Sequence, residues 1–182
     1  LVMMSHQGSR SPEWVELAPS YQCNNRCVGC FSVRDHDEGL SSRAFLRAIQ
    51  EGRRRGGRHL WLGGGEPTLR PDIIKAIRFA KKVGFERIKL QTNAMMFAYE
   101  AFLDRVLRAG LTEANVSIKG ATASRHDGLA QTPGCFDTMT AGITLAVDRG
   151  LSLEGDVLVY RENAAEIPEI VRHFHGLGVE RF

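Results

Sequence analysis

A repeated unit of strand, loop, helix and glycine constrains the fold of this chain more than any other feature. Short runs rich in Val, Ile, Leu and aromatic residues alternate with segments whose apolar residues recur at helical spacing. Strands buried on both faces of a parallel sheet have such runs, and parallel neighbours need a crossover between them. The expected strands are 14–18, 59–62, 87–91, 115–119, 156–160 and a short 179–182.

Amphipathic segments fill the stretches between these strands, and the stretch 124–136 is expected to be a long loop. Five consecutive strand–helix units predict an α/β fold with a parallel sheet and right-handed crossovers. Periodicity alone leaves open whether the sheet is a barrel or an open, doubly wound sheet. Each helix is expected to end at a glycine, which adopts the left-handed conformation at little cost; these are Gly56, Gly84, Gly110, Gly150 and Gly176.

The length of 182 residues suits one domain. We expect a polar N-terminal segment, 1–12, followed by a core domain, 13–182, that stops within its sixth strand–helix unit. Because no helix follows the last expected strand, the chain is interpreted as a truncated piece of a larger protein. The balance of 24 Lys and Arg against 21 Asp and Glu does not call for a nucleic-acid partner. No apolar run is long enough to span a membrane and no export signal is evident, so a cytoplasmic location is expected.

Three of the four cysteines are crowded into a C-x3-C-x2-C segment just after the first expected strand: Cys23, Cys27 and Cys30. Three thiolates on one loop suit a [4Fe–4S] cluster whose fourth iron has no ligand from the loop. Structural zinc is the alternative, but it prefers four ligands, often as two C-x2-C pairs. Here the fourth ligand would have to be His36 or the distant Cys135, and free thiols are a third reading.

The second expected strand runs into Gly63-Gly64-Gly65-Glu66-Pro67. Glycines at a strand end let the backbone approach a ligand closely, and a carboxylate beside them can accept hydrogen bonds from an ammonium group. A tight turn before a helix is the simpler interpretation, and a glycine run alone does not decide between the two.

Together, the cysteine motif after the first strand and Gly-Gly-Glu-Pro after the second resemble the radical S-adenosylmethionine (radical SAM) superfamily, from Trp14 onward. The resemblance implies a partial TIM-type (β/α)6 barrel with its site at the C-terminal ends of the strands. It also implies an enzyme in which a [4Fe–4S] cluster reductively cleaves S-adenosylmethionine. The products are methionine and a 5′-deoxyadenosyl radical, which abstracts hydrogen from a substrate that the sequence does not identify.

The same resemblance implies roles for residues at successive strand ends. Gly64, Gly65 and Glu66 are expected to contact the amino group of S-adenosylmethionine. Ser117 is expected to meet its ribose or carboxylate, and Lys119, two residues on and so on the same face, its carboxylate. For both, the simpler interpretation is a polar strand end in solvent.

Asn163 matches an asparagine often found after the fifth strand of the family, where an ordinary loop cap is the simpler reading. Arg161 beside it is a weaker cofactor candidate. Thr92 and Asn93 match a Thr-Asn-Gly-like motif in which Ala94 replaces the glycine, and Asn93 is expected to cap the turn.

One departure falls inside the cysteine loop, because Gly29 stands where many family members place an aromatic residue that meets adenine. Phe31 is the candidate that compensates for it. His126 is expected to be a surface or structural residue rather than a proton donor, and Cys135 a small buried residue.

The expected partners are an external electron donor, such as flavodoxin or ferredoxin, and the unidentified substrate. The competing interpretation is a non-catalytic iron–sulfur or zinc-binding module, and the piece itself is a candidate for being inactive, because a barrel that stops early exposes a sheet edge.

Overall fold

The computed structural model of the chain describes residues 2–4, 13–30 and 39–182, so Phe31 and His36 lie outside the described residues. The strands are β1 Val2–Met4, β2 Trp14–Leu17, β3 His59–Leu62, β4 Arg87–Thr92, β5 Glu113–Ile118 and β6 Ser152–Val157. The α-helices are α1 Ser42–Arg54, α2 Ile73–Lys82, α3 Glu100–Ala109, α4 Ala123–Ala130, α5 Cys135–Asp148 and α6 Ile167–Gly176. Three 3₁₀ turns are η1 Pro67–Leu69, η2 Met95–Ala98 and η3 Ala164–Glu166. Among these residues, no helix has the length and apolar character needed to cross a bilayer.

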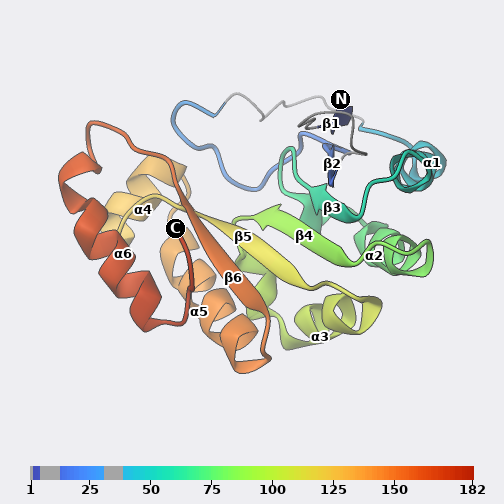
Figure 1. Ribbon diagram of the computed structural model, residues 1–182. Helices are drawn as coiled ribbons and strands as arrows, with labels where there is room; N and C mark the ends of the chain where they lie inside the picture. The colour runs from blue at the N-terminus through green and yellow to red at the C-terminus, as the bar shows by residue number, and fades with distance from the viewer. Residues whose placement is uncertain (1, 5–12, 31–38) are drawn as a thin grey trace. The chain divides into compact units, whose positions relative to one another are not determined.

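The strands form one sheet in chain order, from β1 to β6, in which β2 to β6 are the parallel strands (Figure 1). Trp14 is opposite His59, which is opposite Arg87, so β2, β3 and β4 run parallel with their first residues aligned. The predicted α/β fold with a parallel sheet is therefore confirmed. The strand β1 was not expected and pairs antiparallel with β2, since its three residues are too few to give a periodic pattern.

The described chain divides into two units by its contacts. The first unit comprises Leu1–Cys23, Ser32–Gln91 and Asp104–Glu113, and the second comprises Asn24–Phe31, Thr92–Leu103 and Ala114–Phe182. Each is described by itself below.

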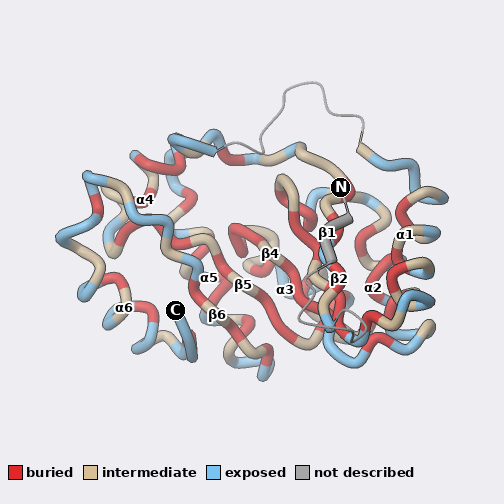
Figure 2. Tube along the Cα trace, turned by 45° about the horizontal axis from the view of Figure 1, so that its top comes forward, coloured by how far each residue is buried: buried red, intermediate tan, exposed pale blue. Residues whose placement is uncertain are grey.

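In the first unit, α1 and α2 lie side by side and bury one face each (Figure 2). Ser41 begins α1 by accepting a hydrogen bond from the Ala44 amide, and Phe45 and Ile49 are fully buried on the inner face. Gly52 on the same face has no room for a Cβ, which would lie 2.6 Å from a Val15 methyl carbon. The fully apolar face of α1 therefore packs closely on β2.

In the second unit, β5 alternates between two environments. Ala114, Val116 and Ile118 are fully buried, whereas Asn115 and Ser117 are half-buried on the opposite face. Since successive strand residues point to opposite faces, the polar residues share one side of the strand. Helix α5 contributes Met139, Ile143 and Ala146 to the core, and it contacts η2 closely through Gly142.

Four sequence-based expectations about local structure were wrong. The expected loop 124–136 contains α4, which Thr122 caps by accepting from the Arg125 amide, while Gly128 and four polar residues within the helix mask the helical pattern. The strand expected at 156–160 ends at Val157 and begins four residues earlier. The expected strand 179–182 is reduced to one parallel bridge, between Glu154 and Arg181. Gly176 lies inside α6, and the left-handed residue after that helix is Gly178, with φ of +99°.

Candidate cluster and cofactor site

In the first unit, the chain leading into Cys23 pairs with the glycine-rich loop that follows β3. The Gly63 amide donates to the Leu17 carbonyl oxygen over 3.0 Å, and the Gly65 amide donates to Ser20 over 2.9 Å. The Glu66 amide donates to the Gln22 carbonyl oxygen over 2.7 Å. The parallel pairing of β2 and β3 thus continues beyond both strands, and it places the chain before Cys23 directly against the glycines.

Two of these glycines are required by how closely the two segments approach. A Cβ built on Gly64 or Gly65 would come closer than 3.0 Å to the carbonyl oxygen of Ser20 or Gln22, a separation that Cβ atoms in proteins essentially never show. Gly64 also has a φ of +102°, which favours glycine. The glycine run is therefore a cradle for the cysteine segment, and not only a turn before a helix.

Glu66 is almost fully buried beside this cradle, with 3% of its surface exposed. Its Oε1 atom accepts hydrogen bonds from the Thr68 amide at 3.0 Å and the Thr68 hydroxyl at 2.5 Å. The carboxylate therefore caps the 3₁₀ turn η1, which fixes the orientation of the side chain. The sequence motif alone did not predict that Glu66 caps this turn.

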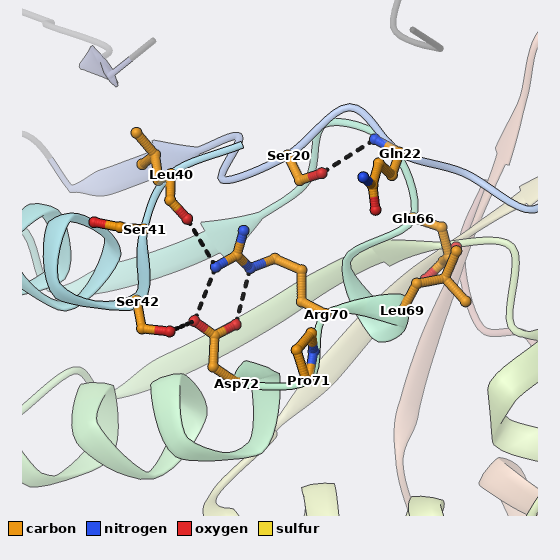
Figure 3. A pocket seen from close by; sticks show the side chains of 10 residues that line it. All are labelled: Ser20, Gln22, Leu40, Ser41, Ser42, Glu66, Leu69, Arg70, Pro71 and Asp72. Carbon is orange, nitrogen blue, oxygen red and sulfur yellow. Dashed lines mark hydrogen bonds and ion pairs between the residues drawn. The ribbon is translucent and has the colours of Figure 1, made fainter. Parts of the chain in front are cut away.

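Arg70 joins the two ends of the chain segment that carries the cysteines (Figure 3). Its Nη1 donates to the Pro19 carbonyl oxygen and its Nη2 to that of Leu40, both over 3.1 Å. Asp72 holds the guanidinium in place through two contacts, to Nε at 2.9 Å and to Nη2 at 2.8 Å, and Ser42 donates to the same carboxylate. A cavity of about 290 Å³ beside this group is lined by polar residues that include Ser20, Gln22, Ser41 and Glu66.

The Arg70–Asp72 pair is shielded from solvent, with 12% and 13% of the side chains exposed. Burial acts to raise the Asp72 pKa, but the hydrogen bonds from Arg70 and Ser42 together hold that pKa below its usual value. Through Arg70, the pair joins Pro19 and Leu40, which flank the part of the chain that carries the cysteines, so we call it the neck clamp.

Replacing Arg70 with alanine is expected to lower the free energy of unfolding by about 3 kcal/mol, because Asp72 loses both contacts to the guanidinium and the carbonyl oxygens of Pro19 and Leu40 each lose one donor. Urea unfolding of the metal-free chain followed by circular dichroism measures this change. Arg54→Ala is the matched control, because Arg54 is 75% exposed and pairs with Glu51 on its own helix. The assignment would be contradicted if Arg54→Ala lowered the free energy of unfolding by more than about 0.5 kcal/mol, or if Arg70→Ala lowered it by no more than this.

In the second unit, Cys27 and Cys30 bracket a tight turn. The Cys30 amide donates to the Cys27 carbonyl oxygen over 3.2 Å, and Gly29 has a φ of +67°. The C-terminal end of α4 holds this turn from outside, since Leu129 and Ala130 accept from the amides of Val28 at 2.9 Å and Arg26 at 3.1 Å. The last carbonyl groups of a helix have no partner within it, so α4 supplies acceptors to the cysteine loop.

The polar end of β5 also lies in the second unit. Lys119 is 7% exposed, and its amide donates to Nδ1 of His126 over 3.3 Å. Asn163 is fully buried, and its Nδ2 donates to the carbonyl oxygens of Lys119 and Leu158, each over 3.0 Å. Arg161 is exposed. The Asn163 amide is thus engaged by the backbone, which gives this residue a positioning role between the ends of β5 and β6.

The Thr-Asn-Ala segment after β4 forms the turn that its sequence indicates. Asn93 accepts from the Met95 amide at 3.1 Å and Thr92 from the Ala94 amide at 3.1 Å, so the predicted cap at Asn93 is confirmed. Ala94 has a φ of +59°, the conformation that a glycine adopts without strain. In addition, Nδ2 of Asn93 donates to the Asn24 side chain over 2.7 Å, a contact to the cysteine loop that the sequence did not predict.

His126 and Cys135 are both buried, as expected for structural residues. Burial lowers the pKa of His126 to about 4, and nearby Lys119 lowers it as well. Burial raises the pKa of Cys135 to about 12, and the hydrogen bond from its thiol to Asp127 adds to this effect. The Asp127 carboxylate also accepts from the amides of Gly134 and Phe136 at the start of α5. Cys135 therefore remains a protonated thiol within this capping group.

The neutral His126 predicts a pH dependence of stability. Its pKa lies near 4 in the folded chain and near 6.5 as an ordinary histidine, so the unfolded chain binds more protons between these values. The free energy of unfolding is therefore constant above about pH 6.5 and falls by about 3 kcal/mol as the pH drops towards 4. Urea titrations of the metal-free chain across this range measure the slope. His126→Asn, which retains an acceptor for the Lys119 amide, is expected to lose this contribution, and an unchanged slope would contradict it.

The donor set of the cysteine loop fits an iron–sulfur cluster. Cys23 and Cys27 are half-buried, Cys30 is exposed, and none of them forms a disulfide. Within residues 2–4, 13–30 and 39–182, no group of three or more His, Cys, Asp or Glu side chains is placed to hold a metal ion. The C-x3-C-x2-C spacing of the three thiols suits a cluster with one open iron better than structural zinc, which often takes two C-x2-C pairs.

Comparison with known proteins decides the family. The profile of the radical SAM superfamily matches residues 17–174. The chain belongs to the radical SAM superfamily. The members of this family use a [4Fe–4S] cluster and S-adenosylmethionine, so the expected family and its cofactors are confirmed.

Relatives of this radical SAM chain are named for widely different activities. It is 27% identical over 173 residues to a probable GTP 3′,8-cyclase of Saccharolobus solfataricus, covering 93% of this chain and 55% of that protein. It is 32% identical over 162 residues to the AdoMet-dependent heme synthase of Methanosarcina barkeri, covering 87% and 46%. The chain therefore spans about half the length of the curated relatives it matches.

A solved structure has the same fold at low sequence identity. Streptococcus suis SuiB bound to S-adenosylmethionine superposes with a TM-score of 0.81 and 17% identity, covering 94% of this chain and 40% of that one. At this identity the likeness concerns the fold alone, and it confirms the partial TIM-type architecture.

Proposed function

We propose that this chain is the catalytic core of a radical SAM enzyme whose cluster is held by Cys23, Cys27 and Cys30. The three thiolates would hold the cluster, and its one-electron reduction would supply the electron for cleaving a C–S bond of S-adenosylmethionine. The cleavage would give methionine and a 5′-deoxyadenosyl radical, which would take a hydrogen atom from the substrate. A one-electron donor such as flavodoxin or ferredoxin would reduce the cluster.

The pairing of the cysteine segment with the glycine cradle is the observation that carries this proposal. A module that binds a metal but no small molecule beside it would not need glycines at two positions where a Cβ would collide with the backbone before Cys23. Nor would it need a carboxylate buried at the end of that cradle. Both features are accounted for if the loop must hold its cluster at a fixed place beside the site for a small molecule.

Residues at the ends of the strands would bind S-adenosylmethionine. In the first unit, Gly64, Gly65 and Glu66 would receive the amino group of S-adenosylmethionine, with Thr68 fixing the orientation of the carboxylate. In the second unit, Ser117 would meet the ribose or carboxylate.

Lys119 would pair with the cofactor carboxylate. Its ammonium group forms no ion pair with another of the described residues, and an ammonium group so largely buried is stabilised by a bound anion. Asn163 would act indirectly, by fixing the backbone of Lys119.

Anaerobic reconstitution of the protein that carries this chain tests the proposal. We expect about four irons and four sulfides per chain, and 5′-deoxyadenosine with methionine in equal amounts after reduction with dithionite. Mass spectrometry of the products and metal analysis of the protein measure both. A single zinc per chain would support the binding-module alternative instead. A full cluster that yields no 5′-deoxyadenosine would overturn the enzymatic assignment.

A further inference from the structure

The turn between Cys27 and Cys30 has two accessible arrangements of its central peptide. Its hydrogen bond from Cys30 to Cys27 spans four residues, and the φ of +67° at Gly29 is the third-position value of a type II turn. A type I turn has the same hydrogen bond but a negative φ at the third residue, so the peptide between Val28 and Gly29 is turned over. Because glycine adopts either sign of φ, residue 29 itself does not select one arrangement.

Tyr160 contacts this central peptide directly. Its hydroxyl donates to the Val28 carbonyl oxygen over 2.7 Å. Its ring lies beside Gly29, with Cε1 3.5 Å from the position that a Cβ of residue 29 would take. In a type I turn the Val28 carbonyl would point away from this hydroxyl, so the hydrogen bond exists only in the observed arrangement.

Asn163 fixes the position of Tyr160. The Tyr160 amide donates to Oδ1 of Asn163 over 2.7 Å, and the Tyr160 carbonyl oxygen accepts from the amides of Asn163 and Ala164. The same asparagine donates to the Lys119 carbonyl oxygen. The tyrosine is therefore attached to a fully buried residue at the end of the sheet, although its hydroxyl lies at an exposed turn.

We infer that Tyr160 is a positioning residue for the cysteine loop: its hydroxyl selects the type II arrangement of the turn that presents Cys27 and Cys30. The inference rests on the proposed function only in regarding these cysteines as cluster ligands. The residue acts on the backbone between two ligands, and it takes no part in the reaction.

Tyr160→Phe tests this, since it removes the hydroxyl and keeps the ring. Tyr99→Phe is the matched control, because Tyr99 belongs to the same unit and is 61% exposed. In the metal-free chain, we expect the ratio of type I to type II turns at Gly29 to rise about tenfold in Tyr160→Phe, the effect of losing one ordinary hydrogen bond. Nuclear magnetic resonance measures this ratio through the three-bond couplings between the amide and α protons of Gly29, which depend on its φ. A ratio within twofold of the Tyr99→Phe value would overturn the inference.

A second variant keeps the test independent of any general loss of stability. Gly29→Ala disfavours the positive φ and is expected to raise the same ratio. Because the hydrogen bond from Tyr160 exists only in the type II arrangement, Tyr160→Phe should destabilise the Gly29→Ala chain to urea much less than it destabilises the wild-type chain. Equal losses of stability in the two backgrounds would contradict a shared target.

The reconstituted protein gives a further readout. Tyr160→Phe should release iron to a chelator about tenfold faster and alter the electron paramagnetic resonance spectrum of the reduced cluster, whereas Tyr99→Phe should do neither. Unchanged iron release and spectrum in Tyr160→Phe would count against the inference. Since the turn ratio is measured without metal, failure of the wild-type protein to bind a cluster would overturn the proposed function and leave that ratio to decide the role of Tyr160.

Discussion

Cys27→Ala is expected to bind less than one iron per chain and to form no detectable 5′-deoxyadenosine. A cubane held by three thiolates from one short loop loses a third of its protein ligands in this variant. Iron and sulfide analysis after anaerobic reconstitution, together with product formation, measures the loss, which should exceed about a thousandfold in rate.

The fourth cysteine is the natural control for this variant. Cys135 is fully buried, and its thiol donates to Asp127 with a pKa raised to about 12, so it does not provide a thiolate for iron. Cys135→Ala should therefore retain the full iron content, with at most a moderate loss of stability. A full cluster in Cys27→Ala, or loss of the cluster in Cys135→Ala, would show that the ligands are wrongly assigned.

Gly65→Ala has the second large expected effect. Its Cβ would collide with the backbone of Tyr21 and Gln22, which cannot rotate away as a side chain can. We expect the free energy of unfolding to fall by about 3 kcal/mol, the upper end for overpacked sites. The segment leading to Cys23 should also be displaced, which lowers the iron content after reconstitution. Urea unfolding and metal analysis measure the two effects.

Gly128→Ala is the control for the glycine variant, because nothing lies within 4 Å of the Cβ that it adds on the exposed side of α4. Alanine is the better residue in a helix interior, so this variant should be more stable by about 1 kcal/mol. Equal stability losses at both glycines would indicate that the close approach of the two segments does not exist.

The sequence predicted the parts of the fold that depend on local pattern. The expected strands 59–62 and 87–91 appear as β3 and β4 within one residue, because their Leu and Ile side chains, such as Leu60 and Ile88, are fully buried. Helix α4 was missed, since its capping residue Thr122 and its exposed Gly128 give no amphipathic pattern. The strand β1 was missed for its shortness, and β6 was displaced because its apolar residues continue into the exposed Leu158 and Val159.

Site residues were predictable where chemistry depends on neighbours in sequence, as in the cysteine motif and the glycine run. Contacts over long sequence separations were not. Arg70 reaches Pro19 across 51 positions and Tyr160 reaches Val28 across 132, and neither residue belongs to a chemical motif. The hydrogen bonds of Asn163 to the carbonyl oxygens of Lys119 and Leu158 were likewise not predictable, and its contact with the cofactor stays a prediction.

The neck clamp has a consequence for how much the cysteine loop can change in length. One guanidinium binds Pro19 and Leu40, and the Leu40 amide also donates to the Pro19 carbonyl oxygen over 2.8 Å, so these two positions are joined directly and not only through the residues between them. The entropy of closing a loop grows only with the logarithm of its length, and doubling the length costs about 0.6 kcal/mol. A change in the number of residues between Pro19 and Leu40 should therefore cost less stability than a change at Arg70.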